Sequence, residues 1–158
     1  MEAQEIKNYR FENEEAYKKA LNAPPDTFAK SRSLGGNRKS KYVPIEESQA
    51  IADFMFDNWN VIQEESKLII NEIIVTLKIQ YQPSYPGADI YFCTGSASKA
   101  IQQQSGSKAE EFPKGKILNS LEYCLGASRS AAINCALGTL GNIFGRNLNR
   151  SVKSNHKK

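Results

Sequence analysis

The sequence predicts an α+β fold: an antiparallel, three- to four-stranded β-meander packed on a long C-terminal helix, with a helix near the N-terminus. Apolar and polar residues alternate over Ile73–Tyr81, which is typical of a strand with one buried face. Sheets with one wet face are normally antiparallel. The long stretch Ile117–Phe144 is apolar and rich in alanine, which favours a helix. We therefore expect one domain at residues 14–150, between an N-terminal extension (1–13) and a basic flexible tail (151–158).

The N-terminal elements are a helix and a turn. Glu14–Leu21 is predicted to be a short helix, which ends before the prolines at positions 24 and 25 because proline lacks the N–H that a helix needs. Ser31–Lys41 contains two adjacent glycines among polar and basic residues. This composition predicts a turn or hairpin that leads into a short strand at residues 42 and 43.

A second helix is expected to begin at Pro44, since proline is well suited to the first turn of a helix. Ile51, Met55 and Trp59 recur every four residues and form one apolar stripe. The stripe predicts a helix that ends near Asn58.

The strands follow this helix. Val61–Glu65 is predicted to be a first, shorter strand, and Pro83–Gly87 is predicted to be the turn after the central strand. Asp89–Thr94 should return as a third strand, with Ile90 and Phe92 facing inward. These three strands make the expected meander.

The C-terminal half is predicted to hold a loop and one helix. Gly95–Lys116 is rich in Ser, Gln, Lys and Gly, and we expect a long mobile connection with a brief helix over Ser98–Gln104. The helix that follows should have about 25 residues, with a row of small side chains packed across the sheet. Because glycine weakens a helix, Gly138 and Gly141 imply a close approach, a bend or a break.

The basic residues are unevenly distributed, although the net charge is only +4. No acidic residue occurs between Ala29 and Ile45, or from Tyr123 to Lys158. A fold that gathers these basic segments on one surface would attract a polyanion. The first segment contains Lys30, Arg32, Arg38, Lys39 and Lys41, and the second contains Arg129, Arg146 and Arg150.

The usual signs of an enzyme are missing, so we expect no catalytic activity and no cofactor. Cys93, Cys124 and Cys135 have no CxxC spacing, which argues against a zinc site and favours small core residues. The single histidine, His156, lies in the basic tail, and there is no phosphate-binding glycine motif. No apolar run is long enough for a membrane span, and no signal peptide is recognisable, so a cytoplasmic location is expected.

Three segments resemble the N-terminal annealing domain of the Rad-fifty-two family, which includes phage single-strand annealing proteins. LNAPPDTFAKSRSLGGNRKSKYVP (Leu21–Pro44) follows the family's order of leucine, proline, serine-arginine pair, glycine run, basic residue and tyrosine. IADFMFDNWNV (Ile51–Val61) is similar to its helix that ends in an aromatic and Asn-Trp sequence. ASRSAAINCALGTLGNIFGRNLNR (Ala127–Arg150) is similar to its alanine-spaced helix.

The resemblance implies binding of single-stranded DNA and annealing of complementary strands without ATP or metal, in homologous recombination and DNA repair. It implies an oligomeric ring or helical filament, encoded by a phage or prophage, with an exonuclease or a single-strand binding protein as a further partner. It also implies a groove in which Arg32 and Tyr42 contact DNA, with Lys39 and Lys41 beside them. A second, outer site would involve Lys114 and Lys116, with Arg146 and Arg150 nearby.

The long helix departs from the family's pattern. Asn134, Cys135 and Gly138 stand where the family has basic residues, and Arg129 replaces part of that charge. Two other functions remain open: a general binding module for RNA or duplex DNA without annealing activity, and a structural ring protein of a phage particle.

Overall fold

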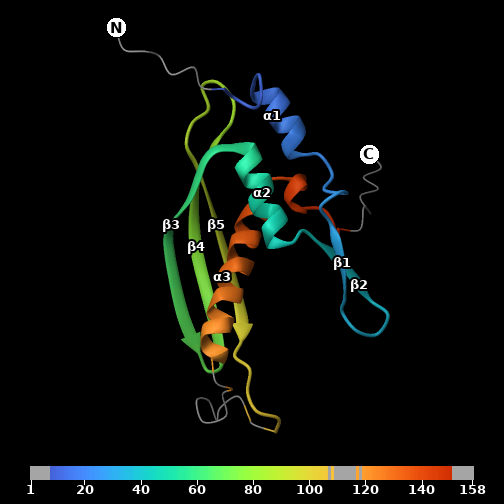
Figure 1. Ribbon diagram of the computed structural model, residues 1–158, viewed down its shortest axis with the longest axis vertical. Helices are drawn as coiled ribbons and strands as arrows, with labels where there is room; N and C mark the ends of the chain where they lie inside the picture. The colour runs from blue at the N-terminus through green and yellow to red at the C-terminus, as the bar shows by residue number, and fades with distance from the viewer. Residues whose placement is uncertain (1–7, 107, 109–116, 118, 151–158) are drawn as a thin grey trace, which may run out of the picture.

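The computed structural model describes residues 8–106, 108, 117 and 119–150, and it confirms the α+β class. A three-stranded antiparallel sheet of order β3-β4-β5 carries a long C-terminal helix on one face, and a separate two-stranded hairpin projects from the body (Figure 1). The elements are α1 (Glu14–Leu21), β1 (Lys30–Ser33), β2 (Lys39–Tyr42), α2 (Ile45–Met55), β3 (Phe56–Ile69), β4 (Glu72–Pro83), β5 (Tyr91–Ala100), α3 (Ser120–Gly138) and the 3-10 helix η2 (Asn142–Phe144).

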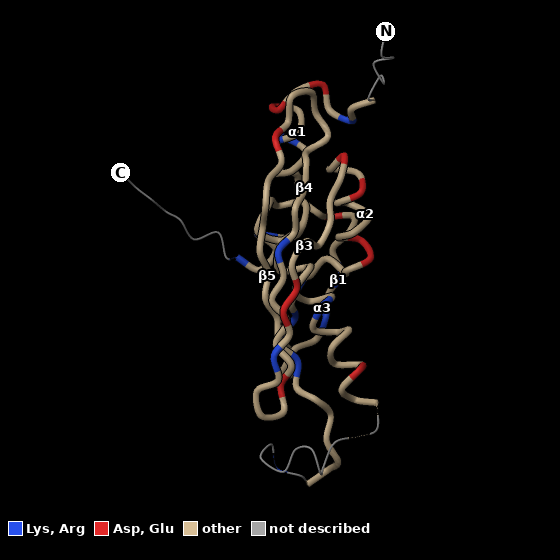
Figure 2. Tube along the Cα trace, turned by 90° about the vertical axis from the view of Figure 1, so that its left-hand side faces the viewer, with Lys and Arg blue, Asp and Glu red and all other residues tan. Residues whose placement is uncertain are grey.

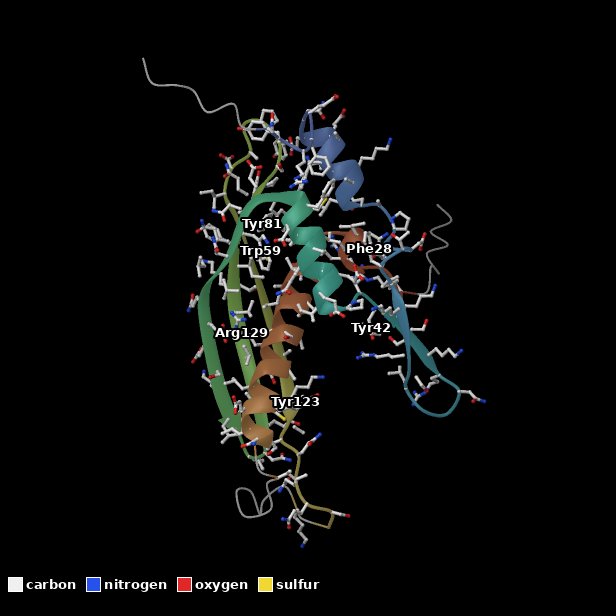
Figure 3. All side chains as sticks on the ribbon, in the orientation of Figure 1. Phe28, Tyr42, Trp59, Tyr81, Tyr123 and Arg129 are labelled. Carbon is white, nitrogen blue, oxygen red and sulfur yellow. The ribbon has the colours of Figure 1, made fainter. Side chains whose placement is uncertain are left out.

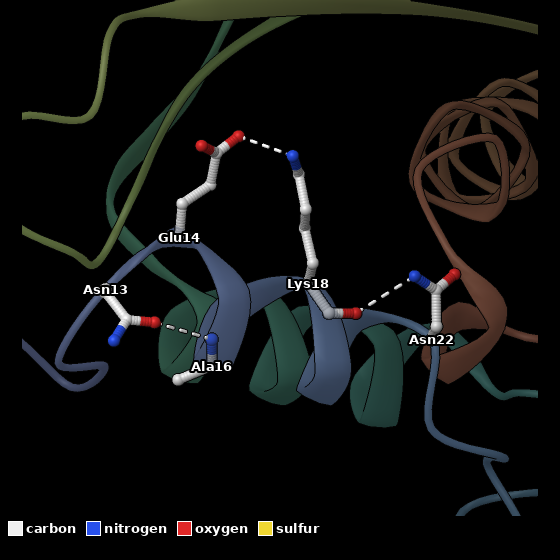
Figure 4. A network of polar contacts seen from close by, with 5 residues as sticks. All are labelled: Asn13, Glu14, Ala16, Lys18 and Asn22. Atoms are coloured by element: carbon white, nitrogen blue, oxygen red, sulfur yellow. Dashed lines mark hydrogen bonds and ion pairs between the residues drawn. The ribbon is translucent and has the colours of Figure 1, made fainter.

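Helix α1 has the predicted bounds and is capped at both ends (Figure 4). The side chain of Asn13 accepts a hydrogen bond from the N–H of Ala16 at 2.9 Å, which satisfies one of the free donors of the first turn. Lys18 forms an ion pair with Glu14 at 2.6 Å, and Asn22 Nδ2 donates to the carbonyl of Lys18 at 2.9 Å. These local contacts explain why a helix of only eight residues ends where the sequence predicts.

The predicted hairpin is present as β1 and β2. Gly35, Gly36 and Asn37 all have positive φ, of 83°, 56° and 62°, a conformation that glycine and asparagine adopt most easily. The second strand covers Lys39–Tyr42 and so begins earlier than the predicted residues 42 and 43. Val43 follows the end of the strand and is buried in the core.

The helix that was expected to reach Asn58 ends at Met55, and β3 begins at Phe56. The apolar spacing continues past this point because Trp59 packs against the core from the strand, where it pairs with Tyr81. Its ring N–H donates to Asp53 on α2 at 2.7 Å. Strand β3 has 14 residues, far more than the predicted Val61–Glu65, because it pairs with β4 from end to end, with register shifts at Phe56/Asn58 and Val61/Gln63.

Strand β4 confirms the predicted alternation. Ile73, Val75, Leu77 and Ile79 are each at most 4% exposed and face the core under α3. The residues between them face the open side of the sheet, where they pair with polar residues of β3 and β5. The core therefore lies between the sheet and the helices α2 and α3.

The prediction that Ile90 and Phe92 face inward is wrong, since they are 52% and 51% exposed. Phe92 pairs with Gln80 on the open side of the sheet, whereas Cys93 pairs with buried Ile79 and faces α3. The strand also continues to Ala100, so the predicted loop is wrong for residues 95–100. The brief helix predicted over Ser98–Gln104 is wrong as well, since residues 98–100 belong to the strand and residues 101–104 are not helical. Pairing with β4 satisfies the backbone of this Ser-rich stretch, which local propensity does not favour as a strand.

Helix α3 has 19 residues and ends at Gly138, so the predicted continuous helix is interrupted. The expected break is present, and η2 follows it after a short turn. A Cβ at Gly141 would lie 2.5 Å from the carbonyl oxygen of Leu21, so this glycine permits the expected close approach. The small residues also pack across the sheet as expected: Ala132 and Ala136 are fully buried, and Ser128 Oγ donates to the carbonyl of Ile73 at 3.2 Å.

Candidate nucleic-acid interface

A groove of about 370 Å³ lies between the β1–β2 hairpin, the C-terminal half of α3 and the segment after η2. Figure 3 shows Tyr42 on the side of the hairpin that faces α3. No aspartate or glutamate is among the described residues that line the groove, which contains two cations. The lining residues are Arg32, Ser40, Lys41, Tyr42, Val43, Ala131, Asn134, Cys135, Gly138, Phe144, Gly145, Leu148 and Asn149.

Arg32 and Tyr42 meet within the hairpin. Arg32 pairs with Ser40 in the register of the two strands, so Tyr42 is its diagonal neighbour, two residues along β2. The guanidinium carbon of Arg32 lies 5.4 Å from the centroid of the Tyr42 ring, a cation–π contact. Within the described part of the chain, no carboxylate forms an ion pair with Arg32. Its guanidinium can therefore meet an incoming anion while the ring keeps it oriented.

Lys41 is positioned by its backbone. Its N–H donates to Asn149 Oδ1 at 3.0 Å, and Asn149 Nδ2 donates to its carbonyl at 2.7 Å. These two hydrogen bonds join the hairpin to the C-terminal segment. Arg150, the next residue, donates to Asn147 Oδ1 at 3.4 Å. The acid-free C-terminal segment and the basic hairpin are therefore neighbours, as the charge distribution predicted.

The helix side of the groove is uncharged. Ala131, Asn134, Cys135 and Gly138 form it, and their small or neutral side chains leave space rather than charge. Asn134 Nδ2 donates to the carbonyl of Val43 at 3.2 Å, which fixes the chain just after β2. The departure from the family's pattern thus falls inside the groove, and the positive charge among its lining residues comes from the hairpin.

The other predicted site residues lie in several places. Arg38 is exposed in the turn of the hairpin, and Lys39 is exposed at the start of β2. Arg146 is exposed beside Gly145, which lines the groove. Lys114 and Lys116 lie outside the described residues, so the predicted outer site has no structural description here.

Arg129 is separate from the groove. Its Nε donates to Glu64 on β3 at 2.8 Å, and Figure 3 shows it on the side of α3 that faces the sheet. Its charge is thus compensated by a carboxylate, whereas the two cations of the groove line an acid-free surface.

The cysteines divide into two kinds. Cys93 and Cys124 are buried, as expected of core residues, and burial raises the pKa of the Cys93 thiol to about 11. Such a thiol stays protonated and unreactive at neutral pH. Cys135 is exposed and lines the groove, so the expectation of a core residue is wrong for it. It lies on the side of α3 away from the sheet, which the helical spacing of Ala132 and Ala136 indicates.

Sequence reasoning missed Asn149, which positions Lys41. One feature of the sequence could have indicated it: the acid-free C-terminal segment has asparagines at positions 142, 147 and 149, and asparagine side chains can form hydrogen bonds to backbone groups of another segment. The same reasoning did not place Phe144 and Leu148 in the groove, since apolar residues near the end of a chain are ordinarily assigned to the core.

Among the described residues there is no group of three or more His, Cys, Asp or Glu side chains that could hold a metal ion. In the same part of the chain, no helix combines the length and apolar character needed to cross a membrane. Comparisons of the chain with protein-family models and with curated proteins found no match.

Proposed function

We propose that this protein binds single-stranded DNA and anneals complementary strands without ATP, as an oligomeric ring or helical filament in homologous recombination and DNA repair. One observation carries the proposal: Arg32, Lys41 and Tyr42 share a groove whose described lining has no carboxylate. An antiparallel meander with a long C-terminal helix supports the proposal, because the resemblance to the Rad-fifty-two family implies an arrangement of this kind.

The groove offers the contacts that a single strand needs. The planar guanidinium of Arg32 can hold two phosphate oxygens, and Lys41 adds a second cation. Each phosphate that is neutralised releases condensed counterions, so binding should weaken as salt rises. The Tyr42 ring can stack on a base or pack on a sugar. Annealing then needs no chemical step, only strands that are held extended with bases free to pair.

The uncharged helix side of the groove makes binding depend on assembly. One copy supplies two lining cations, which is a weak electrostatic contact at physiological salt. In an assembly, the binding of one groove to a strand holds the same strand close to the neighbouring grooves. This raises the effective concentration of the strand at those grooves, so the whole assembly binds more tightly than one copy. We therefore expect short oligonucleotides that fill one groove to bind far more weakly than long ones.

An annealing assay tests the proposal. Two complementary oligonucleotides, one with a fluorophore and one with a quencher, are mixed without ATP in the presence of the protein. We expect faster quenching than spontaneous pairing, and loss of the acceleration in the Arg32→Ala variant. Lys19→Ala, which removes an exposed cation from α1, is the matched control and should retain the activity.

The same oligonucleotides distinguish the other functions. Equal affinity for single strands, duplex DNA and RNA, with no accelerated pairing, would indicate a general nucleic-acid-binding module. Assembly with no measurable affinity for any of them would indicate a structural ring protein. Either result would contradict annealing.

A further inference from the structure

We infer that copies of this chain join head to tail, with an apolar tip of one copy inserted into an apolar socket of the next. The tip is Leu68, Ile69 and Ile70, at the turn between β3 and β4. The inference rests on the oligomer of the proposed function and names the contact that builds it. The socket is lined by Ala20, Ala23, Phe28, Ala50, Ile51, Phe54, Met55 and Ile143.

The tip exposes three consecutive apolar side chains. Leu68, Ile69 and Ile70 are 51%, 53% and 62% exposed, although hairpin turns normally carry polar residues or glycine. Ile70 also has φ of 55°, the left-handed region that β-branched residues strongly avoid. Backbone strain of this kind is concentrated at functional sites. An asparagine or glycine at position 70 would adopt the positive φ with less strain and would not expose an apolar side chain. The presence of an isoleucine there therefore indicates that this side chain binds a partner.

The socket has the complementary chemistry. It has a volume of about 410 Å³ and lies between α1, the segment after it, α2 and η2. All eight lining residues are apolar. Ile51 and Met55, which are 5% and 1% exposed, form its deep side, whereas Phe54 is 51% exposed at its opening. An engineered apolar cavity of about 150 Å³ already holds a benzene molecule, so the socket has room for more than one branched side chain.

The tip of a chain does not reach its own socket. Figure 1 shows the β3–β4 turn at the opposite end of the sheet from α1, and α2 lies along the upper half of α3. The contact is therefore intermolecular, and it joins two different surfaces. Such a heterologous contact repeats from copy to copy, giving a ring if the rotation closes and a filament if it does not.

The charges around the two surfaces permit this contact. Helix α2 carries Glu46, Glu47 and Asp53 with no lysine or arginine, as Figure 2 shows by its red positions. The guanidinium carbon of Arg10 lies 5.2 Å from the centroid of the Phe54 ring, so the opening of the socket carries charges of both signs and suits a partner without net charge. The tip is flanked on its strands by Lys67, paired with Glu65 at 3.0 Å, and by Glu72. Lys99 on β5 pairs with Ile73 on β4 and adds a second positive charge, so the two lysines balance the two glutamates beside the tip.

Two variants test the contact, each damaging one surface. The tip variant combines Ile69→Asp with Ile70→Asn, and the socket variant is Ala50→Glu, at an exposed position of α2. Gln49→Glu adds the same charge to α2 outside the socket lining and is the matched control. Circular dichroism establishes that each variant is folded, and Ile70→Asn alone serves as a second tip variant because it relieves strain.

Mass is measured by sedimentation without DNA. We expect wild type and Gln49→Glu to assemble, and each damaging variant to be a monomer of 17.6 kDa, with the apparent dissociation constant raised at least tenfold. The decisive sample is an equimolar mixture of the tip and socket variants. It retains one intact tip and one intact socket, so we expect heterodimers and no larger species.

Three results would overturn the inference: a monomeric wild type, variants that assemble like wild type, or a mixture that stays monomeric. A monomeric wild type would also contradict the oligomeric part of the proposed function, whereas the other two results concern the tip and the socket alone, because the groove is tested separately. A single-groove oligonucleotide should bind the tip variant, the socket variant and wild type alike, and Arg32→Ala should reduce that binding. Loss of assembly with unchanged binding of the short oligonucleotide separates the two proposals.

Discussion

Asn149 and Lys41, separated by 108 residues in the chain, are joined by two hydrogen bonds between the asparagine amide and the lysine backbone, at 3.0 and 2.7 Å. The hairpin otherwise projects from the body of the molecule (Figure 1). Its position across from α3 therefore depends on a side chain of the C-terminal segment. Together with the hydrogen bond from Asn134 on α3 to the carbonyl of Val43, this pair holds the hairpin against the rest of the groove.

Asn149→Ala should loosen the hairpin. Loss of two hydrogen bonds weakens hairpin docking by about 1 to 2 kcal/mol in total. We expect faster amide hydrogen exchange over β1 and β2, with lower affinity for single-stranded DNA and nearly unchanged global stability. Asn60→Ala, on β3, is the matched control. Unchanged exchange in the hairpin would show that the pair does not position it.

Arg32→Ala should lower the salt dependence of binding. Removing one phosphate contact on a single strand reduces the slope of log K against log salt by about 0.7. Affinity should fall for all sequences alike, because a phosphate contact carries no base information. Arg32→Lys should restore the slope but not the full affinity, since lysine lacks the planar fork. Titrations of a fluorescent oligonucleotide at several salt concentrations measure both. An unaltered slope in Arg32→Ala would remove this residue from the interface.

Tyr42 should act through its ring rather than its hydroxyl. Tyr42→Phe keeps a surface for base stacking and for the guanidinium of Arg32, so we expect affinity near that of wild type. Tyr42→Leu removes both contacts, and stacking is worth about 1 to 3 kcal/mol per base. Fluorescence anisotropy with a pyrimidine oligonucleotide measures the difference. Equal losses in both variants would point to the hydroxyl instead.

Much of the fold was predictable because local signals agreed with tertiary packing. Helix α1 has its own caps, the β1–β2 turn has its glycines, and β4 has an apolar face of period two. The errors arose where pairing overrode local preference. The apolar spacing of α2 continues into β3 because Trp59 packs against the same core from the strand, and the Ser-rich end of β5 is a strand only because β4 lies beside it.

The candidate site divides in the same way. Arg32, Lys41 and Tyr42 were assigned to one groove by the resemblance, and the short hairpin that the glycines predicted brings them together. The contributions of Asn149, Cys135 and Phe144 depend on how α3 and η2 return to the hairpin, which no local pattern encodes. Arg129 shows the converse: its place in an acid-free stretch of sequence gave no sign of its ion pair with Glu64, 65 residues earlier.

Gly95 and Gly126 should respond to alanine with opposite signs. A Cβ at Gly95 would overlap the carbonyl oxygen of Ala132 and lie 2.5 Å from the backbone nitrogen of Ala136, so sheet and helix must separate. Overpacking of this kind costs about 1 to 3 kcal/mol. A Cβ at Gly126, inside α3, meets nothing within 4 Å. Gly126→Ala should therefore stabilise the protein by about 0.5 to 1 kcal/mol. Urea denaturation measures both, and a tolerated Gly95→Ala would contradict the close packing of β5 on α3.

Alkaline pH should destabilise the fold through two groups of the sheet, the partly buried Tyr81 and the buried Cys93. Burial raises the pKa of Tyr81 from 10.0 to about 12 and that of Cys93 from 9.0 to about 11. The folded state therefore holds protons that the unfolded state has lost, so this stabilisation is complete below pH 9 and disappears as pH rises toward 12. Melting temperatures measured across this range should fall. Tyr81→Phe should flatten the fall at its upper end, whereas Tyr123→Phe, at a ring 69% exposed, is the matched control and should follow wild type. An identical fall in Tyr81→Phe and wild type would show that the tyrosine is not the group whose ionisation opens the core.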